Sequence, residues 1–165
     1  MDREEYQGLL SARLAHLKQR AIEELRSILL KPLPEADAIL DVEIFPDSLF
    51  DGLPIRLFFM APSGGTELAP SHELLAGQAD AAWSTAERDA IIQAGEEDDA
   101  FDHLSIDGPA ILAWFVDCWE EAGGSNYPLD AFVGEHDSDK SLRLRTKEWT
   151  RSEGKWRLDH PWGNR

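Results

Sequence analysis

The chain has 165 residues, 42% of them hydrophobic, and carries 32 acidic against 16 basic side chains, for a formal net charge of −16. This length and composition are typical of one domain with its own core, over residues 1–165, and a single cysteine, Cys118, excludes an internal disulfide. The charge disfavours nucleic acid and anionic lipid, and the polar N-terminus and short hydrophobic runs predict neither a signal peptide nor a membrane span, so we expect a soluble cytoplasmic protein.

The first predicted element is a long helix over residues 3–31. Pro32 and Pro34 end it, because proline cannot donate the backbone hydrogen bond that a helix needs. Charged side chains of both signs cover most of its surface. Its hydrophobic stripe follows the ordinary helical period and consists of Leu10, Leu14, Leu17, Ala21, Leu25 and Ile28. This stripe packs on the rest of the domain or, alternatively, joins two copies of the chain into a homo-oligomer.

Two strands follow, over residues 38–45 and 55–60. The first alternates hydrophobic and acidic side chains, and the second is more continuously hydrophobic. Residues 47–54 between them are rich in turn formers, so the two strands predict an antiparallel hairpin.

The middle of the chain reads as helical. Residues 71–94 predict two helical pieces, the second starting at a capping box formed by Ser84 and Glu87. A further helix is predicted over residues 109–122, with Asp107 as its N-cap. This helix is hydrophobic on nearly every side and contains two tryptophans, which places it at the centre of the fold.

Three more strands are predicted towards the C-terminus, over residues 131–135, 141–145 and 155–158, the last together with Trp149. The predicted fold class is therefore α+β. We expect an antiparallel sheet of about four or five strands, packed with the long N-terminal helix and the buried tryptophan-rich central helix.

The acidic side chains are distributed unevenly. Residues 80–139 contain 16 acidic side chains and one basic side chain, Arg88. Such a surface attracts a basic protein by steering its approach, or it is a solvated face that keeps the protein soluble. The predicted partner-binding residues are those of the densest acidic run, Glu96, Glu97, Asp98, Asp99 and Asp102.

A weaker candidate is a metal site at the turn formed by residues 136–140. His136, Asp137 and Asp139 are suitable ligands, and His103 would assist in a metal-dependent hydrolase. The spacing matches no established metal motif, and aspartates also stabilise turns through their own backbone. No metal and no cofactor are therefore assigned.

Motifs for nucleophilic catalysis are missing from the sequence. Cys118 lies on the most hydrophobic helix, where burial makes a thiol inert. The glycine-rich residues 63–65 lack the lysine of a phosphate-binding loop. The basic side chains and tryptophans after residue 141 resemble a single-strand binding surface, but pairing of these bases with the acids of the same fold explains them more simply.

The sequence thus favours a binding module over an enzyme. We expect an acidic soluble protein that engages a basic protein partner, for example an immunity-type inhibitor of a basic toxin. The alternatives are a small metal-assisted hydrolase and a homo-oligomeric structural protein.

Overall fold

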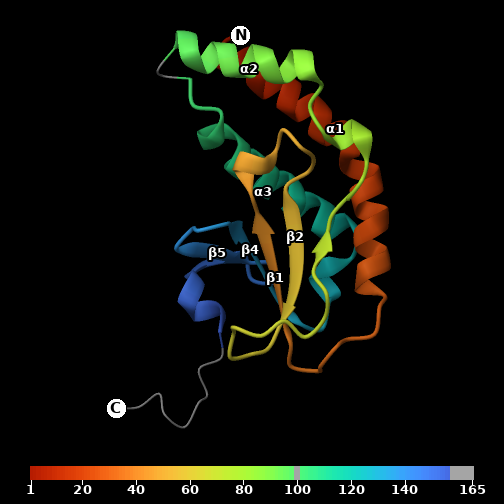
Figure 1. The fold of residues 1–165 in the computed structure, drawn as a ribbon. Coiled ribbons are helices and arrows are strands. Elements are labelled where there is room, and N and C mark those ends of the chain that lie inside the picture. Colours follow the sequence, from red (N-terminus) through yellow and green to blue (C-terminus); the bar gives the residue numbers. More distant parts are fainter. Residues whose placement is uncertain (99–100, 157–165) are drawn as a thin grey trace.

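The structure is a computed structural model, which describes residues 1–98 and 101–156 (Figure 1). Within these residues the chain forms three α-helices and one sheet of six strands in the order β3-β2-β1-β4-β5-β6. The helices are α1 (Arg3–Leu29), α2 (Thr85–Glu97) and α3 (Leu104–Glu121). The strands are β1 (Ile39–Ile44), β2 (Ile55–Met60), β3 (His72–Glu73), β4 (Asp130–Glu135), β5 (Lys140–Arg143) and β6 (Glu148–Arg151).

The predicted α+β class is confirmed, but the sheet is mixed and has six strands, so the prediction of an antiparallel sheet of about four or five strands is wrong. The hairpins β1–β2 and β4–β5 are antiparallel, and β1 and β4 pair in parallel between them, with Ile39 beside Asp130 and Ile44 beside Glu135. A parallel pair requires a long crossover, which α2 and α3 supply.

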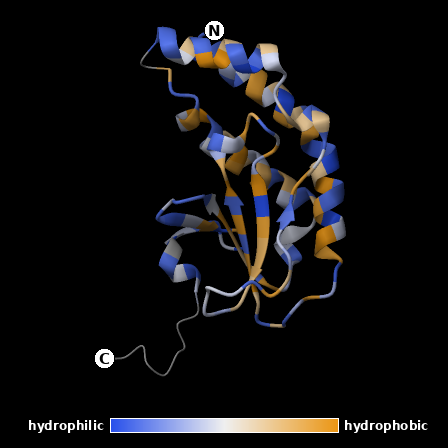
Figure 2. Ribbon diagram, viewed as in Figure 1, coloured by the Kyte–Doolittle hydropathy of each residue, from blue (hydrophilic) through white to orange (hydrophobic). Residues whose placement is uncertain are grey.

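Both long helices cover the same face of the sheet. The hydrophobic side of β1, formed by Leu40, Val42 and Ile44, belongs to one buried cluster with the stripe of α1 and with Trp119 of α3. Figure 2 shows the resulting alternation of hydrophilic and hydrophobic bands along α1. The stripe of α1 is therefore buried within its own domain and is not available to join a second copy.

The opposite face of the sheet, here called the outer face, carries Asp41 and Phe132, which are neighbours in the parallel register. A short 3-10 turn, η4 (Ser152–Lys155), follows β6 and packs on this face through Lys155, whose ammonium group reaches Asp41. This turn replaces the strand predicted at residues 155–158, of which 157 and 158 lie outside the described residues.

Two helix boundaries also differ from the prediction. Of the two helical pieces expected over residues 71–94, only the second forms, because the first contains β3 and a 3-10 turn at Ala79–Ala81. The buried side chains Leu74 and Leu75 hold this segment in the core without helical periodicity. Helix α3 begins at Leu104, so Asp107 lies inside the helix and is not its N-cap.

Gly124 is required where the chain leaves α3. A β-carbon at this position would overlap the ring of the buried Trp119. We expect Gly124→Ala to lower the free energy of unfolding by about 1–3 kcal/mol, as overpacked cores do. Gly8 in α1 has no atom close to its missing β-carbon, so Gly8→Ala should raise the free energy of unfolding by about 0.5–1 kcal/mol. Urea unfolding of both variants checks this contrast, and equal effects would contradict it.

Candidate functional site

The predicted partner-binding residues gather where α2 ends. Glu96 and Glu97 form its last turn, and Asp98 is its C-cap residue. All three side chains are exposed. Asp99 lies outside the described residues, and Asp102 is exposed just before α3. In Figure 1, α2 lies beside the N-terminus, at the opposite end of the molecule from the loop that joins α1 to β1.

The position of Glu96 and Glu97 is electrostatically unfavourable. The carboxyl end of a helix carries a partial negative charge, and an acidic side chain there costs roughly 0.3–1 kcal/mol. The last turn of α2 contains no basic side chain. Gln93 donates a hydrogen bond of 2.6 Å to Glu97, which leaves the charge of that carboxylate in place. Local stability therefore does not explain these acids.

Asp102 has a structural explanation of its own. Its carboxylate accepts a hydrogen bond of 3.1 Å from the backbone N–H of Leu104, the first residue of α3. An acid is favourable at this end of a helix, because it complements the positive end of the helix dipole. Asp102 thus contributes charge to the surface, but its presence does not require a partner.

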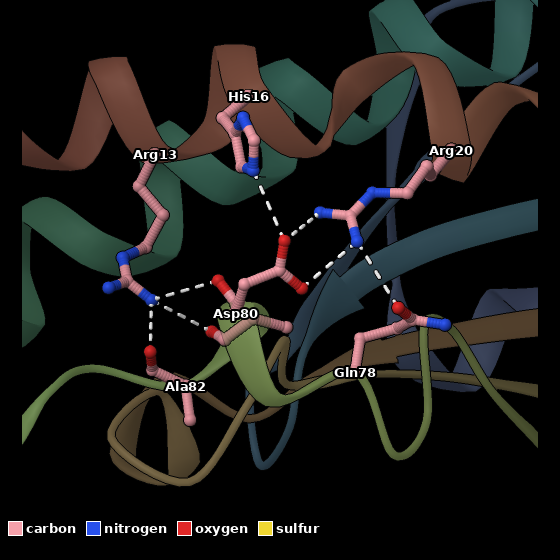
Figure 3. A network of polar contacts seen from close by, with 7 residues as sticks. Arg13, His16, Arg20, Gln78, Asp80 and Ala82 are labelled. Carbon is pink, nitrogen blue, oxygen red and sulfur yellow. Dashed lines mark hydrogen bonds and ion pairs between the residues drawn. The ribbon is translucent and has the colours of Figure 1, made fainter.

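Other acids in the same part of the chain are neutralised by bases of α1. Asp80 binds Arg20 at 2.6 Å and 2.9 Å and lies 3.1 Å from His16 (Figure 3). The hydrogen bonds from Arg20 lower the pKa of Asp80 to about 2. Arg13 bonds the carbonyl oxygen of Ala82 and lies 3.4 Å from Glu87. The acids that face α1 are therefore paired.

The basic side chains near the C-terminus are also paired within the fold. Arg143 binds Asp130 at 2.7 Å and Lys147 binds Glu120 at 2.7 Å. Lys155 binds both carboxylate oxygens of Asp41 at 2.8 Å. These pairs support the interpretation that the bases balance acids of their own domain. Within residues 1–98 and 101–156, no ion pair joins Glu96, Glu97 or Asp102 to a base.

The metal candidates do not converge. The Nδ1 atom of His136 lies 2.9 Å from Glu43 and its Nε2 atom 3.6 Å from Asp137, while its ring packs on Phe45. Asp139 is exposed in the same connection between β4 and β5, directly before β5. Among the described residues, no three His, Cys, Asp or Glu side chains form a group that could hold a metal ion.

A buried polar cluster escaped sequence reasoning. Asp107 is fully buried in α3, and its two carboxylate oxygens face the hydroxyl of Tyr6 and the Nδ1 atom of His103, the latter at 3.0 Å. Tyr6 is buried on the same side of α1 as the hydrophobic stripe, and the sequence pattern does not indicate that its hydroxyl has a polar partner. The cluster joins the two long helices, and the hydroxyl of Tyr6 donates to the carboxylate.

Removing that hydroxyl tests the cluster. We expect Tyr6→Phe to lower the free energy of unfolding by about 1–3 kcal/mol, because a buried carboxylate oxygen loses its donor. The hydroxyl of Tyr127 makes no hydrogen bond within the described residues, so Tyr127→Phe is the matched control and should change the free energy of unfolding less. Chemical unfolding measures both, and equal losses would show that the hydrogen bond contributes nothing specific.

Two further expectations concern reactivity and membranes. Cys118 is buried as predicted, and burial raises the pKa of its thiol to about 12, which disfavours the reactive thiolate. None of the described helices has the length and hydrophobicity needed to cross a bilayer.

Comparisons of the chain with protein-family models, with curated proteins and with solved structures find no match. The candidate site therefore rests on the geometry of the acidic end of α2 alone.

Proposed function

We propose that the protein is a binding module that engages a basic protein through the acidic end of α2. The binding residues are Glu96, Glu97, Asp98 and Asp99, with Asp102 adding charge at the margin. The observation that supports this proposal is the position of Glu96 and Glu97 at the negative end of a helix, with no base in that turn. A basic partner would supply the missing positive charges.

The wider charge distribution favours the same kind of partner. Residues 80–139 hold 16 acids and one base, and α1 neutralises only those acids that face it, among them Asp80 and Glu87. A surface of one sign accelerates the approach of an oppositely charged protein by about 10–1000-fold, and salt weakens the effect. The acidic end of α2 would therefore act mainly on the association rate.

An immunity-type inhibitor is the specific version of this proposal. A toxin that degrades nucleic acid carries a cationic substrate site, and an acidic protein of small size can cover such a site by charge complementarity. The net charge of −16 and the single-domain length are consistent with that role.

The test begins with capture of a basic protein from a bacterial lysate and its identification by mass spectrometry. Association is then measured by stopped-flow mixing as salt is raised from about 50 mM to about 300 mM, which shortens the range of charge interactions. The association rate should fall steeply with salt. Neutralising the acids as Glu96→Gln, Glu97→Gln, Asp98→Asn and Asp99→Asn should slow association about tenfold at low salt.

A control variant that loses the same number of charges elsewhere distinguishes a binding site at the end of α2 from an effect of the net charge. Its four changes are Glu35→Gln, Asp37→Asn, Glu67→Gln and Glu153→Gln, all at exposed positions outside α2. This variant should associate nearly as fast as the parent protein. If both variants slow equally, the net charge alone governs the encounter, and an unchanged rate in the first variant would remove the end of α2 from the interface.

A further inference from the structure

The outer face of the sheet contains a cavity of about 670 Å³ between the strands β4 to β6 and the turn η4. Small-molecule sites in proteins commonly measure about 300–1000 Å³ and combine hydrophobic walls with a few placed polar groups. This cavity has both kinds of lining, and it lies on the face that α1 and α3 do not cover.

Aromatic rings form part of the wall. Phe132 projects from β4 and is almost fully buried, and Trp156 follows η4. The position of Trp156 is constrained by Gly64, because a β-carbon on Gly64 would come within 2.8 Å of the indole ring. Aromatic walls of this kind favour a ligand with a planar ring, which can stack or pack edge to face.

Two cations and two carboxylates also line the cavity. The Arg143 guanidinium lies 6.0 Å from the centre of the Phe132 ring and binds Asp130 at 2.7 Å. The ammonium group of Lys155 donates to the Asp41 carboxylate, and the Glu148 side chain is exposed at the rim of the cavity. With Asp41 included, the charged groups at the cavity sum to −1, in a protein whose net charge is −16. An anion is repelled less here than at the acidic end of α2.

Arg143 also retains an unused donor. Its Nε atom is buried and has no hydrogen-bond partner in the described part of the chain. Buried donors are nearly always satisfied in native proteins, and one without an acceptor is unfavourable. An acceptor that enters beside the guanidinium, with a small rotation of the Arg143 side chain, would relieve this deficit.

We propose that this cavity binds a planar aromatic anion, with its ring against Trp156 and its carboxylate or sulfonate on Arg143. This site is separate from the acidic end of α2 and does not depend on the proposed protein partner. Arg143 supplies a fork of donors that suits a carboxylate, and the half-buried indole of Trp156 offers a surface on which the ring can pack.

The test uses three small probes and the full-length protein. 2-Naphthoate carries both the planar aromatic ring and the carboxylate. 2-Naphthylmethanol keeps the ring without the charge, and cyclohexanecarboxylate keeps the charge without the aromatic ring. We expect 2-naphthoate to bind at least about fivefold more tightly than either analogue, since each loses one set of contacts. In NMR titrations, the indole signal of Trp156, which lines the cavity, should shift, and those of the core residues Trp114 and Trp119 should not.

Two arginine variants provide the matched comparison. Arg143→Gln should weaken 2-naphthoate binding about fivefold or more. Arg56→Gln removes an arginine that lies 5.2 Å from the Phe45 ring beside another cavity, and it should leave binding unchanged. If Arg143→Gln disturbs the fold, the three-probe comparison on the parent protein still decides.

The proposal fails if 2-naphthylmethanol binds as tightly as 2-naphthoate, or if Arg56→Gln weakens binding as much as Arg143→Gln. Shifts of the core tryptophans alone would also overturn it. A short oligothymidylate serves as a competitor. If it displaces 2-naphthoate at a concentration below the dissociation constant of 2-naphthoate, the cavity is a nucleic-acid contact instead.

Discussion

Lys155→Met should lower the free energy of unfolding by about 3–5 kcal/mol, the largest loss we expect from a single substitution in this chain. Lys155 and Asp41 are both buried, and the ammonium group contacts both carboxylate oxygens at 2.8 Å. Methionine fills a similar volume, but it leaves the Asp41 carboxylate buried without its counterion. Urea unfolding near neutral pH, followed by tryptophan fluorescence, measures the loss.

The loss in Lys155→Met should also depend on pH. Burial raises the pKa of Asp41, and removal of the nearby ammonium group raises it further. An acid whose pKa is raised by folding binds its proton more tightly in the folded state, so stability falls as pH rises through that range. The variant should therefore be less impaired at mildly acidic pH than at neutral pH.

A double variant provides the control for this pair. Asp41→Leu combined with Lys155→Met removes both charges together, and such hydrophobic replacements of buried ion pairs are often neutral or stabilising. The double variant should recover most of the stability that the single variant loses. If the double variant is as unstable as Lys155→Met alone, the loss comes from packing around η4, and the ion pair is not its cause.

Cys118 should make the protein sensitive to alkali. Burial raises the pKa of its thiol from about 9 to about 12, so the unfolded chain releases this proton more readily than the folded one. The contribution of the protonated thiol to the free energy of unfolding is fully present below about pH 9 and is lost as pH rises towards 12. Linkage gives a loss of about 1.4 kcal/mol per pH unit, up to about 4 kcal/mol over this range.

Cys118→Ala isolates this contribution from other groups that titrate in the same range. The free energy of unfolding, measured by urea at several pH values from 8 upward, should fall less steeply in the variant than in the parent protein. A thiol reagent should modify Cys118 only after unfolding. Parallel pH profiles for the two proteins would show that the thiol ionises equally well in the folded state.

The elements that the sequence predicted well are those with regular periodicity. The hydrophobic stripe of α1 and the alternation of hydrophobic and acidic side chains in β1 each indicate which side of the element faces the core. The segment around β3 has no such period, because single side chains such as Leu74 and Leu75 hold an irregular chain in the core. The mixed sheet was also invisible, since two antiparallel hairpins look the same whether they meet through a parallel or an antiparallel pair.

The candidate site could also be predicted only in part. A run of acids is visible in any sequence, but their partners depend on the tertiary structure. The contrast between Asp80, which Arg20 neutralises, and Glu96, which lies in a turn without bases, appears only in the fold. The same holds for Asp107, whose partner Tyr6 is 101 positions away, and for Lys155, 114 positions from Asp41.

The parallel pairing of β1 with β4 has a consequence for folding. Since β1 precedes α2 and α3 and β4 follows them, one edge of β1 has no strand to pair with until the chain has been made beyond residue 135. Contacts between distant parts of a chain slow folding, and an unpaired central edge is prone to aggregate. During synthesis, the middle of this sheet is completed late, and the contact of Lys155 with Asp41 forms later still, since Lys155 follows β4 to β6 in the chain.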